Sequence, residues 1–441
     1  MHTFKYSALF CAVTATIFSF SNAHANESSK GFLEGSRLDA KLRNVYFNRD
    51  GRDESPYDNR EWVQGLHLNY HSGYFADMIG FDMSYYGAWD LDSPGDSFTH
   101  LPKDGRNQRE TNDINKIGQA FVKFKYGNDD LNVNIKHGRQ VYNDNLIQGS
   151  SSRAAPSSLY GTTGEVNIGE LKLHGAYITQ HSWRSFGHFE HFYDGSSTDA
   201  NTKKVNYIQA YGLAYQFDNG IGIEYDWGKS NDFQKANLYK IHYTMELGDN
   251  NKLYLEGIHH TLESIGDAFN QTFSNADDFE SKNTSFLAQL HLDAATYRLA
   301  YQHTAKGDFR YAWETGEYYG GFNSSIPVWS DFAYKDEKAI MVGFTYDFSD
   351  MGAPGLEFDV NYQRGFDLDK NNNGLGDTID RPKTEWGRDM TLSYAFQDPT
   401  LKGLSVSWNN GTYRGSKTLI PGNTEDIDYN RIYIDYVFDI F

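Results

Sequence analysis

The chain has 441 residues, of which 39% are hydrophobic and 16% aromatic, and 40 Lys and Arg against 59 Asp and Glu give a formal net charge of −19 at pH 7. This acidic balance argues against nucleic-acid binding, which requires a basic face. The single cysteine, Cys11, excludes an intramolecular disulfide and a metal site built from several thiolates.

The first 25 residues have the features of a secretory signal peptide. Lys5 gives a short basic region, residues 6–20 are mostly apolar, and Ala23-His24-Ala25 is a cleavage site of the A-x-A type. We predict cleavage before Asn26 and a single domain over residues 26–441. Beyond this segment no apolar run approaches the 18 residues or so that a spanning helix needs.

Alternation of apolar and polar residues predicts β-strands along the rest of the chain. In residues 338–362, for example, Ile340, Val342 and Phe344 alternate with Met341 and Gly343, and the pattern resumes after a turn. Eighteen strands are predicted in this way, over residues 36–49, 61–71, 75–88, 117–127, 130–139, 163–169, 170–180, 205–217, 221–228, 236–246, 252–260, 284–293, 295–304, 338–348, 355–364, 387–397, 403–411 and 430–440.

The connections between these strands alternate in length. Those after even-numbered strands are short, and those after odd-numbered strands are mostly long, with residues 229–235 as the modest exception. Short turns on one rim and long loops on the other, with an even number of strands, are typical of outer-membrane barrels. The predicted fold is therefore all-β: a transmembrane, antiparallel, up-and-down β-barrel with short periplasmic turns and long extracellular loops.

In such a barrel the apolar side chains face lipid and the charged ones face the lumen, because a charge at mid-bilayer costs roughly 2–4 kcal/mol. The predicted lumenal row of basic residues contains Arg37, Lys41, Arg43, Lys123, Lys125, Lys136, Arg139 and Arg298. The predicted opposing acids are Glu224, Asp226, Glu256, Glu357 and Asp359. Facing rows of opposite charge would select solutes by a transverse field. The alternative is that these groups only pair and hydrate the lumen.

Two long loops are rich in aromatic residues, which suit sugar rings because a ring face stacks while hydroxyls form hydrogen bonds. The alternative is that these side chains pack the loops together. The candidates for sugar contacts are Trp183, Trp313, Tyr318 and Trp329.

Residues 369–380 have the spacing of a calcium-binding loop, with oxygen-bearing residues at positions 1, 3, 5 and 12 and glycine at position 6. The candidate ligands are Asp369, Asn371, Asn373, Leu375 through its carbonyl, and Asp380. Position 12 is Asp instead of the usual Glu, and an Asn- and Gly-rich surface turn is the alternative. A structural calcium is the only cofactor that the sequence suggests.

Several stretches resemble the OprD family of outer-membrane porins. They are LRNVYFNRD (42–50), REWVQGLHLNYHSGYF (60–75), SSRAAPSSLYG (151–161) and GRDMTLSYAF (387–396). Within that family, residues 72–83, 120–127 and the terminal FDIF look most similar to chitoporin-type members. The resemblance implies a narrow, monomeric, eighteen-stranded channel with a lumenal ladder of basic residues and a constriction shaped by an inward-folding third loop. We expect no enzymatic activity.

Carried over residue by residue, the resemblance assigns Arg43 and Arg49 to the first strand's motif, Arg153 to the third loop and Arg388 to a late strand. The chain departs from the family pattern at Ala154-Ala155, where bulkier apolar residues are usual. Pore width is therefore the property that the resemblance defines least.

These observations lead to the expectation of a porin in the outer membrane of a Gram-negative cell. It would contact membrane lipid and let small polar solutes diffuse passively, with chitooligosaccharides or other amino-sugar oligosaccharides as preferred cargo. Small carboxylates or basic amino acids are the alternative cargo. Two other classes remain open: a barrel enzyme, which needs a catalytic cluster that is not recognisable in the sequence, and a secreted β-rich binding protein.

Overall fold

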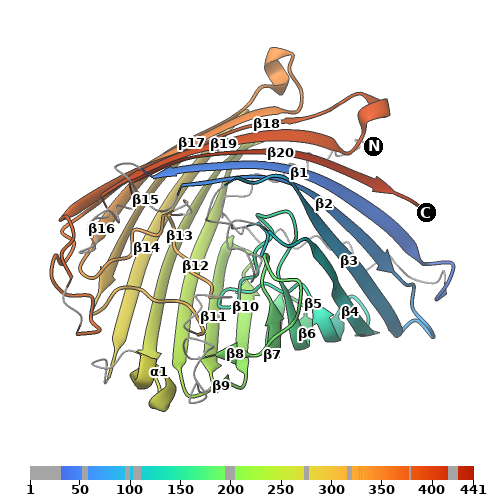
Figure 1. The fold of residues 1–441 in the computed structure, drawn as a ribbon, viewed down its shortest axis with the longest axis horizontal. Coiled ribbons are helices and arrows are strands. Elements are labelled where there is room, and N and C mark those ends of the chain that lie inside the picture. The colour runs from blue at the N-terminus through green and yellow to red at the C-terminus, as the bar shows by residue number, and fades with distance from the viewer. Residues whose placement is uncertain are drawn as a thin grey trace.

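The structure is a computed structural model that describes residues 31–51, 58–94, 100–102, 111–193, 204–272, 278–314, 320–326, 328, 330–376, 379–415 and 426–441. Eighteen strands form one antiparallel sheet that curves into a barrel (Figure 1). They are β1 (Arg37–Gly51), β2 (Asn59–His71), β3 (Ile79–Asp92), β4 (Ile114–Gly127), β5 (Leu131–Gln140), β6 (Ser158–Ile168), β7 (Leu171–Ser182), β10 (Ile208–Gln216), β11 (Ile221–Ser230), β12 (Gln234–Gly248), β13 (Asn251–Ser264), β14 (Glu280–Leu292), β15 (Ala295–Ala305), β16 (Lys338–Asp347), β17 (Leu356–Phe366), β18 (Thr384–Ala395), β19 (Leu404–Arg414) and β20 (Ile427–Asp439).

The barrel closes because the first and last strands pair with each other. β1 pairs with β2 on one side and with β20 on the other, in a register that runs from Asp39 opposite Asp439 to Gly51 opposite Ile427. Closure leaves no free sheet edge, as a barrel in lipid requires. A small hairpin, β8 (Phe192–Tyr193) with β9 (Lys204–Val205), and the helix α1 (Gly266–Thr272) lie in the long connections.

The predicted fold class and strand number are confirmed, with differences at the strand ends. β6 begins at Ser158 instead of residue 163, and β3 begins at Ile79 because residues 75–78 form a tight turn. At the C-terminus the amides of Ile440 and Phe441 both donate to the carbonyl of Leu38, so the chain slips out of phase there. That slip explains why Phe441 breaks the alternation of the last strand.

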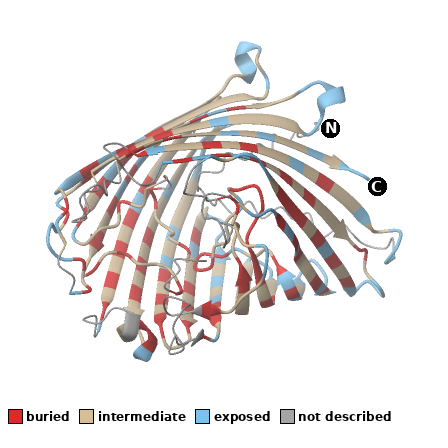
Figure 2. Ribbon diagram, viewed as in Figure 1, coloured by how far each residue is buried: buried red, intermediate tan, exposed pale blue. Residues whose placement is uncertain are grey.

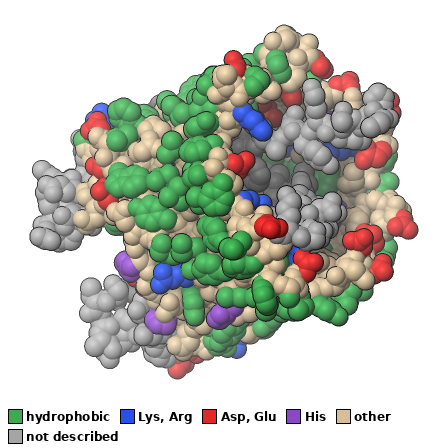
Figure 3. All heavy atoms as spheres, turned by 90° about the vertical axis from the view of Figure 1, so that its right-hand side faces the viewer, with side chains coloured by type: hydrophobic (Ala, Val, Ile, Leu, Met, Phe, Trp, Pro, Cys, Tyr) green, Lys and Arg blue, Asp and Glu red, His purple; other side chains and the backbone are tan. Residues whose placement is uncertain are grey.

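Burial alternates along the strands, as Figure 2 shows. In β16, Ala339 and Met341 are fully buried inside the barrel, whereas Ile340 and Val342 are 43% and 51% exposed on its outside. In Figure 3 hydrophobic side chains cover much of the outer wall, and the opening beside them is bordered by charged side chains. Among the described residues, no helix is long and apolar enough to cross a bilayer.

Candidate functional site

Residues 141–157, here called the inner loop, connect β5 to β6 and cross the inside of the barrel. At one end of the crossing, Arg43 of β1 donates to the carbonyl of Ser151 (2.6 Å) and Tyr433 of β20 to that of Ser152 (2.8 Å). At the other end, Asn145 Nδ2 donates to Glu224 (2.8 Å) and Asp226 (2.7 Å) of β11. In the strand order, β11 is eight strands from β1 and nine from β20, which is the opposite wall. The inner loop therefore spans the lumen.

A second long connection meets the inner loop there. Within residues 306–337, called the second loop, Trp313 Nε1 and the amide of Gly321 both donate to the carbonyl of Leu146, at 2.8 and 2.9 Å. Asn323 Nδ2 donates to the carbonyl of Asn145 at 2.6 Å. These bonds join the two loops at the β11 end of the crossing, and the loops together narrow the lumen.

Close contact with the wall explains the two small residues of the inner loop. Ala154 and Ala155 are fully buried, and the carbonyl of Ala154 accepts a hydrogen bond from His67 Nε2 at 2.7 Å. A Cβ atom on Gly65 of β2 would lie 2.6 Å from the same carbonyl oxygen. The loop backbone lies so close to β2 that bulkier side chains at 154 and 155 would have no room.

Arginines gather where the inner loop reaches β1 and β20. The guanidinium carbons of Arg153 and Arg431 lie 5.4 and 5.1 Å from the ring centre of Phe47, and Arg184 donates to Ser150 Oγ at 2.9 Å. Burial, and then the charges of Arg153, Arg431 and Arg184, lower the pKa of His100 well below its usual range. Within the described residues, no carboxylate lies within 4 Å of the guanidinium of Arg153 or Arg431. This arginine cluster is a place where an anion could bind.

Two members of the cluster were not identified from the sequence. Arg431 lies on the same row of β20 as Tyr433 and Asp435, so alternation could have identified it. Arg184 lies in a loop, where alternation gives no signal. Arg43 itself is held by Asp435, with Nε to Oδ1 at 2.8 Å and Nη2 to Oδ2 at 2.7 Å.

The acids on the opposite wall are partly compensated by neighbouring side chains. Lys240 Nζ lies 3.3 Å from Glu224 and 3.5 Å from Glu256, and His174 Nε2 lies 2.8 Å from Asp226. Three carboxylates therefore share one lysine and one histidine, so at the level of the inner loop the lumen has a cationic side and an acidic side.

The other two predicted acids, Glu357 and Asp359, lie on the inward row of β17, nearer the rim with the short turns. Asp359 pairs with Arg298, and Glu357 belongs to the same row. The ion pair of Asp359 is local to strands β15–β17.

The remaining predicted basic residues occupy several environments. Lys41 Nζ lies 3.0 Å from Asp435, and Lys123 Nζ lies 2.9 Å from Asp82. Lys125 lies over the ring of Tyr74 and Lys136 over that of Phe121, at 4.1 and 5.3 Å from the ring centres. Arg37 is exposed at the start of β1, on the short-turn rim.

For Arg139 and Arg388 the lumenal prediction is wrong. Arg139 shares the outward row of β5 with Ile135, and its exposed guanidinium lies over Phe189 at 4.5 Å. Arg388 shares the outward row of β18 with Trp386, between the inward Gly387 and Asp389. Side chains alternate at every residue, so neither can reach the lumen from these positions.

The aromatic candidates divide in a similar way. Trp313 is only 1% exposed and its ring N–H is bonded within the loops, so the prediction that it stacks on a sugar is wrong. Trp183 is half-buried, with the Arg184 guanidinium 4.8 Å from its ring centre. Tyr318 and Trp329 lie outside the described residues.

The proposed calcium loop is held by basic side chains. Asp369 pairs with Lys335 at 2.5 Å and Asp380 with Lys370 at 3.0 Å. Arg381 donates to the carbonyls of Asp369 and Asn372, and Asn373 Oδ1 accepts from the amide of Leu375. Asn371 donates its amide to Asp369. Among described residues no cluster of three His, Cys, Asp or Glu side chains could hold a metal ion. Calcium binding stays a prediction. It would require Lys335 and Lys370 to move away from Asp369 and Asp380.

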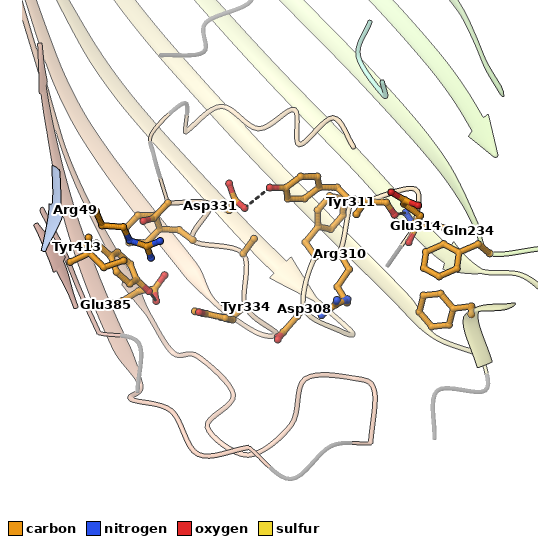
Figure 4. A pocket seen from close by; sticks show the side chains of 18 residues that line it. Arg49, Gln234, Asp308, Arg310, Tyr311, Glu314, Asp331, Tyr334, Glu385 and Tyr413 are labelled. Carbon is orange, nitrogen blue, oxygen red and sulfur yellow. Dashed lines mark hydrogen bonds between the residues drawn. The ribbon is translucent and has the colours of Figure 1, made fainter. Parts of the chain in front are cut away.

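A cavity of about 400 Å³ opens between the second loop and the strand ends at the long-loop rim (Figure 4). Its lining combines cations, acids and rings, among them Arg49, Arg310, Tyr311, Glu385 and Tyr413. Tyr311 donates to Asp331 at 2.8 Å, the bond drawn in the figure. A polar solute entering from this rim would meet this vestibule before the arginine cluster.

Comparisons with known proteins agree with this architecture. A family model described as outer membrane porin, OprD family, matches residues 30–440. Porin D of Pseudomonas aeruginosa is 26% identical over the whole of both chains, and chitoporin of Escherichia coli is 23% identical over 83% of this chain and 82% of its own. Among solved structures, OccAB2 of Acinetobacter baumannii has a TM-score of 0.77 at 20% identity, covering 93% of this chain and all of that one. OpdK of Pseudomonas aeruginosa with vanillate has a TM-score of 0.74 at 21% identity, with the same coverage.

Proposed function

The chain belongs to the OprD family of outer membrane porins, and from this premise we propose that its preferred cargo is a small solute carrying a carboxylate. The family assignment makes it a non-enzymatic channel for small solutes in the outer membrane. Its long loops then face the cell exterior. What remains to be proposed is which solutes it prefers and which residues select them.

The arginine cluster carries this proposal. Arg153 of the inner loop and Arg431 of β20 beside it lie where the passage is narrowed, without a carboxylate partner among the described residues. Guanidinium groups bind carboxylates through paired hydrogen bonds that are stronger than those between neutral groups. A carboxylate entering through the vestibule would pass from Arg49 to this cluster. The vanillate in the OpdK structure is a carboxylate and supports the same choice.

Chitooligosaccharides are the second candidate, and they were the first choice from the sequence. The 23% identity to chitoporin and the half-buried ring of Trp183 favour them. The identity to Porin D, at 26%, favours no sugar in particular. A chitoporin-like preference for these sugars is therefore the weaker of the two proposals. We also propose that the porin is a monomer and that residues 1–25, which lie outside the described residues, are removed as a signal peptide.

Single-channel recording in planar bilayers tests the two proposals. We expect anion preference in a KCl gradient and concentration-dependent current blockage by small carboxylates such as vanillate. Blockage by chitotriose without blockage by carboxylates would replace the first proposal by the second. Cation preference together with blockage by arginine or lysine would contradict both and favour basic amino acids.

A further inference from the structure

Two arginines lie on the outer surface of the barrel, near the ends of β17 and β18 that the long connection 367–383 joins. In the sheet register Arg364 lies opposite Trp386, and Tyr362 lies opposite Arg388. All four side chains belong to the outward rows of their strands, so arginines and aromatic rings alternate in a square. We call these four residues the outer arginine patch.

The two arginines differ from the other cations around them. Arg414 and Lys338, on the neighbouring strands, pair with Asp428 at 2.7 Å and Asp367 at 2.9 Å. Within the described part of the chain, Arg388 donates to neutral groups, the side-chain oxygens of Asn410 and Thr412, and its Nε is buried there without a hydrogen bond. Arg364 is exposed, and no described carboxylate lies within ion-pairing distance of it. The patch therefore carries two positive charges that no described carboxylate compensates.

The aromatic members show at what depth these charges lie. Tyr362 and Trp386 are 42% and 38% exposed, and their rings stack with centres 6.0 Å apart. Towards the short turns the same rows continue with Val360, Met390 and Leu392, which are apolar. Tyrosine and tryptophan mark the boundary between hydrocarbon and headgroups. The arginines thus lie at the level of the headgroups, on the side of the outer leaflet.

We propose that the outer arginine patch binds the phosphate of an anionic lipid in the outer leaflet. The backbones of diagonal neighbours on paired strands are roughly 7–8 Å apart, so both side chains can reach one phosphate once Arg388 leaves Asn410 and Thr412 of β19. The rings of Tyr362 and Trp386 would lie against the upper part of the acyl chains. This site is on the outside of the barrel and is independent of the cargo that passes through it.

Native mass spectrometry of the purified full-length porin in non-ionic detergent can count the bound lipids. We expect retention of phosphatidylglycerol, which has an anionic phosphate headgroup, in preference to phosphatidylcholine. Since each Arg or Lys at an anionic surface contributes about a fivefold gain in affinity, Arg364→Gln/Arg388→Gln should bind phosphatidylglycerol roughly 30-fold more weakly. Arg388→Lys, which keeps the charge, should retain most of the binding.

Lys338→Gln is the matched control, because Lys338 lies on the next strand and is already paired with Asp367. Equal losses in the control and the double variant would overturn the proposal, as would equal retention of both lipids by the unmodified protein. Displacement of the lipid by millimolar inorganic phosphate would also overturn it and indicate a site for free anions. Circular dichroism confirms folding of each variant, and an unchanged single-channel conductance separates this site from the lumen.

Discussion

Arg43 and Asp435 face each other across the seam at which β1 and β20 close the barrel, and they are joined by two hydrogen bonds of 2.8 and 2.7 Å. Lys41 Nζ lies 3.0 Å from the same carboxylate, so a single acid holds two lumenal cations. The same Arg43 donates to Ser151 of the inner loop. The pair therefore connects closure of the barrel to the position of the loop that narrows it.

Asp435→Asn should weaken this seam. The substitution leaves Arg43 and Lys41 without their carboxylate in a largely buried position, which should lower the free energy of unfolding by about 1–3 kcal/mol. Urea unfolding in detergent, followed by tryptophan fluorescence, measures the change. Asp92→Asn is the control, because Asp92 and its partner Arg60 are 61% and 48% exposed and such pairs contribute little. A loss of equal size in the control would contradict a special role for the seam.

Arg153→Gln and Arg431→Gln should each reduce preference for anions. Because a hydrogen bond to a charged group contributes about 1.5–3 kcal/mol, the concentration of carboxylate that blocks half of the current should rise roughly tenfold or more. Planar-bilayer recording gives both the blocking concentration and the ion preference. Arg139→Gln, on the outward row of β5, should change neither. If all three variants behave alike, the arginine cluster does not select the solute.

Trp313→Ala should widen the passage. The indole is buried between the two loops and bonded to the carbonyl of Leu146, so its removal leaves a cavity and frees the inner loop. We expect a larger and noisier single-channel current, and a smaller effect from Trp313→Phe, which keeps most of the packing. Trp183→Ala, at a half-buried position, serves as the comparison. An unchanged conductance in Trp313→Ala would show that the second loop does not hold the inner one.

The attachment of the second loop should weaken as pH rises. Burial, and then the charge of the neighbouring Glu385 carboxyl, raise the pKa of Glu337 well above its usual range, although the charge of Arg381 acts to lower it. The hydroxyl of Tyr413 donates to Glu385. The attached loop therefore keeps a proton that the released loop loses. At pH values between the ordinary pKa of glutamate and the raised pKa, the free energy that favours the attached loop decreases by up to about 1.4 kcal/mol per pH unit. Below that window both forms are protonated and the effect vanishes.

Hydrogen exchange of residues 330–337, read by mass spectrometry at pH 5 and pH 8, measures this attachment. Exchange should be faster at pH 8 after correction for the intrinsic rate, and Glu337→Gln should remove the difference. Glu263→Gln alters an exposed acid paired with Lys235 and should leave the pH dependence intact. Persistence of the dependence in Glu337→Gln would assign it to another group.

Several misassigned residues could have been placed correctly from the sequence. Arg388 alternates with Asp389 and shares its row with Trp386 and Leu392, so parity alone assigns it to the outer surface. At Arg388 the family motif and this alternation disagree, and the structure follows the alternation. Arg139 stands three residues after the lumenal Lys136, an odd step that changes the face. Arg431 could have been identified as lumenal from the same rule.

The sequence by itself determined the barrel: the number of strands, their inward and outward rows, and the rim that carries the long loops. These properties depend on the two-residue period of a strand and on loop length, both of which are local. Only the tertiary structure decided that residues 141–157 cross to β11, that Trp313 is buried against Leu146, and that Asp369 and Asp380 pair with lysines. Such contacts join residues far apart in the chain, and no local period encodes which wall a loop reaches once the barrel has closed.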